Sequence, residues 1–250
     1  MGRITDTVKA LLIINIIFFI GSLGLGDAAL QWFALWFPKN DHFQFWQIIT
    51  HMFMHGDTTH IFFNMFMLYM FGSHLEQSIG QQKFLFLYFS AGLGAAGLQI
   101  LFTYIQFYPG YEAYVEAGFS PAEIYSFINE TIQAGQFRIN PNIDQEVTQN
   151  MIRAFSTPMV GASGAISGVI MAFAVLYPNL PLYLMFIPVP IKAKYMIGAY
   201  FLIDLYGGIT GNSVLGPSNV AHWAHIGGAI IGFLTMWYWK KNSFNQNRWN

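Results

Sequence analysis

Long apolar stretches alternate with shorter polar segments along the whole chain. Six such stretches occur, at residues 8–25, 58–78, 83–107, 158–177, 195–210 and 220–239. A helix needs about 20 predominantly apolar residues to cross the hydrocarbon core of a bilayer, and each stretch approaches or reaches that length. The pattern therefore predicts an all-α, polytopic membrane protein in which six transmembrane helices form one membrane-embedded domain over residues 1–250.

The segment between the first two stretches, residues 26–50, is rich in aromatic residues but also contains Pro38 and Asp41. Aromatic side chains gather at membrane–water interfaces, so we expect this segment to be an interfacial loop. The first stretch could alternatively belong to a signal peptide. Its apolar core is long and no clear cleavage site follows it, which favours a retained helix.

Residues 108–156 differ from the rest of the chain because six acidic residues occur there. Ser120-Pro121-Ala122-Glu123 has the pattern of a capping box with proline in the first helical turn. Apolar residues then recur at helical spacing, and a second amphipathic pattern follows between Ile143 and Phe155. This segment is predicted to be a helical extramembrane insert.

The composition supports the membrane assignment and excludes some functions. Apolar residues make up 54% of the chain and charged residues only 9%, against about 25% charged residues in soluble domains. The formal net charge is -1 and no basic patch occurs, so nucleic acid is not an expected partner. The absence of cysteine excludes disulfides and thiolate metal sites.

The basic residues predict the orientation in the membrane. With six spans and a cytoplasmic N-terminus, eight of the 11 Lys and Arg residues fall on the inner side. Both termini are then cytoplasmic, and a bacterial inner membrane is the expected location. This topology places the starts of the second, fourth and sixth spans near the outer face, where His60, Ser163 and His225 lie.

Small residues mark two of the stretches. Gly164 and Gly168 are four residues apart, as are Gly228 and Gly232, so each pair lies on one helical face. Such faces let two membrane helices approach closely. Ser163, which follows Gly161 at the start of the fourth stretch, would then lie in a helix–helix seam.

His225 could activate this serine. A serine hydroxyl is a poor nucleophile unless a positioned base takes its proton, and the packed glycine faces could bring His225 to Ser163. No aspartate lies on the sixth stretch, so the sequence favours a Ser-His dyad over a triad. Asp204, on the fifth stretch, is either a packed polar contact or a proton-relay residue.

Further polar residues accompany this pair. His60 and Asn64 are four residues apart and share a helical face; they could donate hydrogen bonds to an oxyanion or simply connect helices. His51 and His55 are expected to be interfacial or structural, and His222 is expected to be a loop histidine beside the site.

These motifs, in this order and spacing, resemble the rhomboid family of intramembrane serine proteases. The residues that carry the resemblance are Gly161-Ala162-Ser163-Gly164-Ala165, Ala224-His225-Ile226-Gly227-Gly228 with Gly232, and His51-Met52-Phe53-Met54-His55 followed by His60-Ile61-Phe62-Phe63-Asn64. The resemblance implies a six-helix fold, Ser163 as nucleophile, His225 as base, and His60 and Asn64 as oxyanion donors. It further implies single-span membrane proteins as substrates, admitted past the fifth helix and the loop 211–219.

The sequence departs from the family pattern in three places. Gln47 follows Trp46 where the family has arginine, which puts the stabilising role of that loop in doubt. Ser167 stands where an aromatic ring often stacks on the catalytic histidine. The insert at 108–156 is longer than expected between the third and fourth spans.

Two other functions remain open. One is a non-catalytic relative that binds membrane proteins, although the presence of both Ser163 and His225 favours activity. The other is a histidine-lined, metal-dependent membrane enzyme or transporter. No His-Glu-x-x-His motif occurs and no carboxylate adjoins the outer starts of the spans, so no metal and no other cofactor is expected. The expected partners are the lipid bilayer and single-span protein substrates.

Overall fold

The structure is a computed structural model that describes residues 3–135, 140, 142–184, 187–214 and 220–246. Its helices are α1 (Asp6–Leu25), α2 (Asp27–Phe33), α3 (Gln47–Thr50), the 3-10 helix η1 (His51–Phe53), α4 (Thr58–Met67), the π-helix η2 (Leu68–Gly72), α5 (Ser73–Ile79), α6 (Gln81–Glu116), α7 (Pro121–Ala134), α8 (Gln145–Ser156), α9 (Ser163–Leu176), α10 (Ala193–Thr210) and α11 (His222–Gln246). The strands are β1 (Pro181–Leu184) and β2 (Ile187–Lys192). A helix or a continuous helical run occupies most of each of the six apolar stretches.

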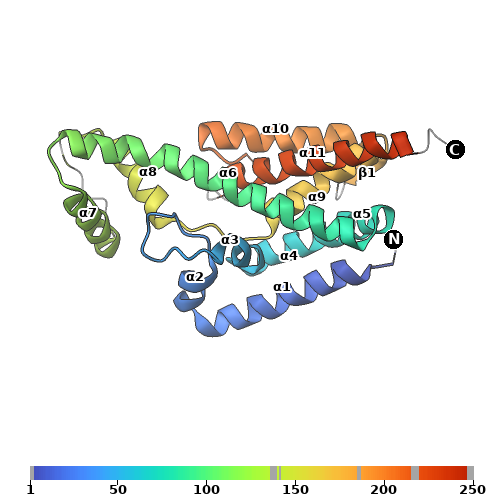
Figure 1. Ribbon diagram of the computed structural model, residues 1–250, viewed down its shortest axis with the longest axis horizontal. Coiled ribbons are helices and arrows are strands. Elements are labelled where there is room, and N and C mark those ends of the chain that lie inside the picture. The colour runs from blue at the N-terminus through green and yellow to red at the C-terminus, as the bar shows by residue number, and fades with distance from the viewer. Residues whose placement is uncertain (1–2, 136–139, 141, 185–186, 215–219, 247–250) are drawn as a thin grey trace.

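Helix α9 lies at the centre of the bundle (Figure 1). It packs against α11 and α6, and most of its residues are buried. The buried side chains around it come from α1, η2, α6 and α11 and include Val8, Leu68, Leu87 and Met236. Helix α10 covers a smaller part of α9 and α11 from the side.

The predicted glycine seam joins α9 to α11. A Cβ atom added to Gly228 would lie 1.9 Å from the carbonyl oxygen of Gly164, and one added to Gly232 would lie 2.1 Å from that of Gly168. Real Cβ atoms do not come so close to a backbone oxygen, so no larger residue can occupy these positions without moving the helices. The two backbones are therefore in direct contact.

Large apolar side chains cover the outside of the bundle. On α1, Ile13, Ile17 and Ile20 are exposed, as are Leu202 on α10 and Phe233 on α11. Judged by length and composition alone, two of the described helices, α1 and α6, are long and apolar enough to cross a membrane. Helix α9 is apolar but shorter. The count of six membrane crossings stays a prediction.

Three helix boundaries differ from the predicted ones, and one of them is the end of α11, which continues beyond residue 239 to Gln246. Residues 158–162 are not helical: Met159 pairs with Leu35 in an isolated antiparallel bridge, and the helix begins only at Ser163. Helix α6 does not end near residue 107 but continues through Pro109 to Glu116. Close packing supports this extension, because a Cβ atom on Gly110 would lie 2.5 Å from the carbonyl oxygen of Val147 in α8.

The insert contains the two predicted helices. The Ser120 side chain and Glu123 form the reciprocal capping box at the start of α7, and Asp144 caps α8. These helices pack on the end of α6 through an apolar cluster that includes Tyr114, Ile128 and Met151. The insert thus continues the helical bundle at one end (Figure 1).

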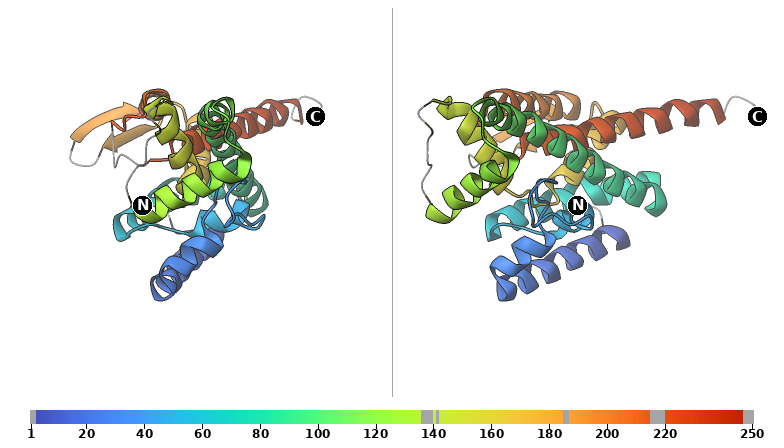
Figure 2. Two further views of the ribbon diagram at one scale, coloured as in Figure 1. Left: turned by 90° about the vertical axis from the view of Figure 1, so that its left-hand side faces the viewer. Right: turned by 60° about the vertical axis from the view of Figure 1, so that its left-hand side comes forward.

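The all-α prediction is wrong for the segment between α9 and α10. There, β1 and β2 form an antiparallel hairpin in which Pro181 pairs with Lys192. Helix-breaking prolines at 181, 188 and 190 favour extended backbone over a helix at this point. The hairpin projects from the bundle (Figure 2) and lies at the end opposite the insert (Figure 1).

Candidate active site

Ser163 is the first residue of α9, and the preceding loop fixes its position. Gly161 has a φ of 121°, which favours glycine, and its N–H donates to the carbonyl oxygen of His51 over 2.9 Å. The N–H groups of the first helical turn have no carbonyl partner within the helix. Ser163 therefore lies beside backbone donors that have no partner within α9, and donors of this kind can stabilise an oxyanion.

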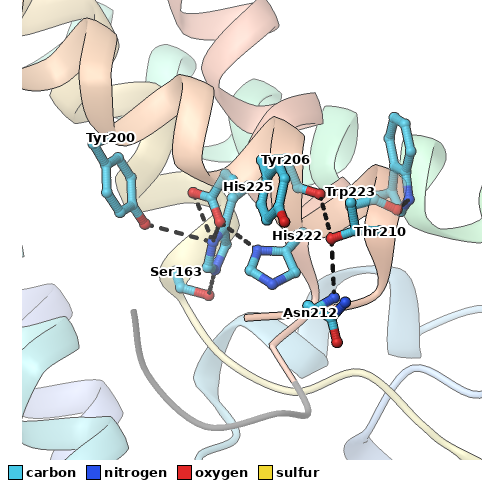
Figure 3. Close-up of polar contacts among 10 residues, drawn as sticks. Ser163, Tyr200, Tyr206, Thr210, Asn212, His222, Trp223 and His225 are labelled. Atoms are coloured by element: carbon cyan, nitrogen blue, oxygen red, sulfur yellow. Dashed lines mark hydrogen bonds and ion pairs between the residues drawn. The ribbon is translucent and has the colours of Figure 1, made fainter. Parts of the chain in front are cut away.

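His225 lies in the first turn of α11 and contacts this serine. Its Nε2 atom lies 2.9 Å from the Ser163 Oγ atom (Figure 3). The glycine seam begins at Gly164, the residue after Ser163, and at Gly228, three residues after His225, where the two backbones are in contact. The predicted approach of the two side chains is thus observed, and it depends on the packing of α9 against α11.

The structure adds Asp204 to this pair. Its carboxylate oxygens lie 3.1 and 3.2 Å from His225 Nδ1, and Oδ1 also lies 2.7 Å from His222 Nδ1. The expectation that no carboxylate adjoins the outer starts of the spans is therefore wrong for the sixth span, and it is also wrong for the second, where Asp57 directly precedes α4. Asp204 comes from α10, not α11, and it is the only charged residue within residues 195–210. Its isolation in an apolar stretch was the available sign of a polar function.

His60 lies close to Ser163, beside Gly161. A Cβ atom on Gly161 would lie 2.7 Å from His60 Nε2 and 3.5 Å from Ser163 Oγ, so glycine leaves the space that the imidazole occupies. The His60 Nδ1 atom accepts from the Gly56 N–H at 3.5 Å. Asp57 caps α4 by accepting from the backbone N–H of His60, which fixes where this helix begins.

Asn64 follows His60 by one turn of α4 and is buried. Its Nδ2 atom has no hydrogen-bond partner among the described residues. A buried amide donor without a partner is unfavourable by about 1–3 kcal/mol, so this group is available to a ligand that carries negative charge.

His51 and His55 are buried outside the long helices. The Nδ1 atom of His51 lies 2.8 Å from the carbonyl oxygen of Gln47, and burial lowers the pKa of this histidine to about 4. Burial, with a smaller effect of His60, lowers the pKa of His55 to about 4. The His55 ring lies edge-on to that of His60, with 5.1 Å between centroids. Both histidines are neutral at pH 7, and the His51 carbonyl anchors the loop before Ser163.

Gln47 stabilises the first loop without a positive charge. Its side-chain oxygen accepts from the N–H groups of Trp36 and Gln44, and its amide donates to the carbonyl oxygens of Gln31 and His42. The side chain is fully buried. Gln47 therefore connects separate parts of this loop by itself.

The small side chain of Ser167 leaves space beside His225, and a residue from α10 is close to the histidine there. The Tyr200 hydroxyl lies 3.5 Å from His225 Nδ1 (Figure 3). Ser167, Tyr200, Asp204 and His225 line a small pocket together with apolar residues of α9, α10 and α11. The aromatic neighbour of the histidine thus comes from α10 and not from α9.

The same carboxylate and two histidines are the residues that could hold a metal ion. Single donor atoms of Asp204, His222 and His225 lie within 4.8 Å of one another. Imidazole nitrogen and carboxylate oxygen are suitable zinc ligands. However, the hydrogen bonds between these groups already account for their approach.

Together, the helical bundle with its apolar exterior and the paired serine and histidine define an integral membrane protein with the arrangement of a serine hydrolase. The Rhomboid domain family matches residues 42–128 and 131–242. The chain therefore belongs to the rhomboid family.

Two relatives illustrate the range of this similarity. The chain is 30% identical over 202 residues to "RHOMBOID-like protein 12, mitochondrial" of Arabidopsis thaliana, covering 79% of this chain and 47% of the relative. It is 27% identical over 95 residues to "Rhomboid protease GlpG" of Yersinia pestis, covering 38% of this chain and 34% of the relative. The aligned regions span less than half the length of these relatives.

Proposed function

We propose that this protein is an intramembrane serine endopeptidase that cleaves single-span membrane proteins in or near their transmembrane segment. The observation that carries the proposal is the 2.9 Å contact between Ser163 Oγ and His225 Nε2 at the head of the glycine seam. Membership of the rhomboid family supports it, as does the similarity to the Yersinia relative, which is named a rhomboid protease.

In the proposed reaction, Ser163 Oγ attacks the scissile carbonyl carbon as its proton passes to His225 Nε2. The backbone N–H of Ser163 and the side chains of His60 and Asn64 donate hydrogen bonds to the resulting oxyanion. His225 then gives the proton to the leaving amine, and an acyl-enzyme remains. Water, deprotonated by His225, releases the second product and restores the serine.

We further propose six membrane crossings, with α4, η2 and α5 together forming the second. In this topology the termini are cytoplasmic and the insert is outside. Cysteines at Glu130 and Lys194 test this, since the chain has no cysteine of its own. Only the cysteine at residue 130 should react with an impermeant thiol reagent on intact cells; the reverse result would invert the topology.

The location in a bacterial inner membrane stays a prediction. The name of the Arabidopsis relative places that protein in mitochondria and so does not support it.

Cleavage of a defined substrate tests the function. The purified wild-type protein should cut members of a panel of single-span proteins, and mass spectrometry of the products should map the cut within or beside the span. The Ser163→Ala variant should not cut. A wild-type protein that binds these proteins without cutting them would instead be a non-catalytic binding factor, and equal cleavage by Ser163→Ala would remove the serine from the reaction.

A metal-dependent function is the second candidate, because Asp204, His222 and His225 form a possible ligand set. Zinc content of the purified protein, and activity after chelation, separate this candidate from the serine mechanism. Stoichiometric zinc together with loss of activity on chelation would favour the metal enzyme.

A further inference from the structure

One carboxylate contacts both histidines of α11. Asp204 Oδ1 lies 2.7 Å from His222 Nδ1 and 3.1 Å from His225 Nδ1, and Oδ2 lies 3.2 Å from the latter. The side chains of all three residues are largely buried. A buried carboxylate needs hydrogen-bond donors, and both imidazoles lie within hydrogen-bond distance of it, with the Tyr200 hydroxyl beside them.

These contacts determine which nitrogen of His225 carries the proton. An ionised carboxylate accepts hydrogen bonds but cannot donate them. His225 Nδ1 must therefore be the protonated nitrogen, and Nε2 has a free electron pair directed at the Ser163 hydroxyl, 2.9 Å away. This is the tautomer that can act as a base toward Ser163.

His222 holds the carboxylate in place. Its ring lies against Gly207 of α10, where a Cβ atom would be 2.5 Å from His222 Nε2. The same reasoning puts a proton on His222 Nδ1, so this residue donates the shorter of the two hydrogen bonds. The hydrogen bond from His222 thus holds the Asp204 carboxylate in the position from which it contacts His225 Nδ1.

We infer that Asp204 is a positioning residue for the proposed protease, so that the site works as a Ser163–His225–Asp204 triad and not as a dyad. The inference rests on the proposed function for its catalytic consequence. During attack, the Ser163 proton moves to His225 Nε2, the Nδ1 proton stays on the imidazole, and Asp204 stays ionised. The carboxylate stabilises the imidazolium that forms and prevents the ring from adopting the other tautomer.

The test compares Asp204→Asn with the wild-type protein. The amide is the same size but can donate to Nδ1, which favours the wrong tautomer. In soluble proteases with a triad, this change lowers kcat about 10⁴-fold. We expect the rate at which a fluorophosphonate modifies Ser163 to fall at least about 10²-fold, with the KM for a membrane substrate little changed. Asp144→Asn, at the start of α8, removes a carboxylate but keeps a good cap and should behave as wild type.

A spectroscopic measurement separates positioning from a merely structural role. Nitrogen chemical shifts of ¹⁵N-histidine-labelled protein report which ring nitrogen is protonated, and signals that disappear in His225→Gln assign the residue. The wild type should show protonated Nδ1 at His225, and Asp204→Asn should show Nδ1 without its proton. If the asparagine variant does not fold, Asp204→Ser removes the carboxylate with less bulk and is measured in the same way.

The outcomes distinguish this inference from the proposed function. A wild-type Ser163 that never reacts with the fluorophosphonate would contradict the protease itself. A reactive wild type together with an Asp204→Asn variant that reacts at the same rate, or that keeps the Nδ1 proton of His225, would contradict the positioning role alone.

Discussion

The two sides of α11 contact their neighbours in different ways. Toward α9, glycines bring backbone against backbone, and no side chain intervenes where Gly228 meets Gly164. Toward α10, the contact is made by polar and aromatic side chains: Asp204 with the two histidines, and Trp223, whose indole donates to the Gly208 carbonyl oxygen over 3.1 Å. Backbone contact leaves little freedom, whereas side-chain contacts can break and reform.

The difference separates two requirements of the proposed site. The nucleophile and the base lie on the glycine seam, so their distance is set by the tightest packing in the bundle. The carboxylate that orients the base lies on α10, the helix predicted to move when substrate enters. Part of the loop that follows this helix, residues 215–219, lies outside the described residues. If α10 moves as predicted, we expect entry of substrate and orientation of His225 to be coupled through this one helix.

Breaking the seam should have the largest effect. In Gly228→Leu, the new side chain meets the Gly164 carbonyl oxygen and must separate α9 from α11. We expect cleavage to fall below detection and the Tm in detergent to decrease. The matched control is Gly198→Leu on α10, where no atom lies within 4 Å of an added Cβ and activity should persist. Full activity of the Gly228 variant would show that the seam does not set the site.

Removing a proposed oxyanion donor should have the next largest effect. His60→Ala and Asn64→Ala should each lower kcat about 10²-fold while KM changes little, because these hydrogen bonds strengthen in the transition state. Steady-state kinetics on a mapped substrate measure both constants. Phe63→Ala changes an exposed neighbour on α4 and serves as the control. A change confined to KM would make the two residues substrate-binding groups instead.

Acid should weaken the loop that presents Ser163. Because the folded pKa of His51 is about 4 against 6.5 unfolded, the unfolded chain binds more protons below pH 6.5, and stability falls as the pH decreases. His51 alone should contribute a loss of about 2 kcal/mol between pH 7 and pH 5, and His55, whose pKa is lowered in the same way, should add to it. Chemical denaturation at both pH values measures it. His51→Gln should reduce this pH dependence, whereas substitution of the exposed His74 should not.

Loosening the packing of α10 should change the cleavage rate least, and it should raise the rate where the seam and donor variants lower it. Phe201 lines the small pocket that also contains His225 and Asp204, so Phe201→Ala should raise the cleavage rate of membrane substrates a few-fold and lower Tm. Leu202→Ala, on the exposed face, is the control. A slower rate would indicate that the packing of α10 matters more for holding Asp204 than for excluding substrate.

Features of the fold that depend on short-range residue spacing could be predicted from the sequence. Glycine spacing in the fourth and sixth stretches identified the seam, and the Ser120–Glu123 capping box located the start of α7. Contacts between separate elements were missed. Nothing near Pro109 indicates that α8 packs beside it and supports a longer α6, and the pairing of β1 with β2 depends on a turn whose register is not apparent from composition. Asp204 was noted, but its role depends on how α10 lies against α11.

The most direct test of the account is the modification of Ser163 by a fluorophosphonate, mapped by mass spectrometry. We expect the intact wild-type protein in detergent to be modified at Ser163 and at no other serine. Modification should be lost in His225→Ala, which removes the base, and in Gly228→Leu, which separates the seam that brings base and serine together. Equal modification of Ser163 in all three proteins would contradict the claim that packing of α9 against α11 creates the reactive serine.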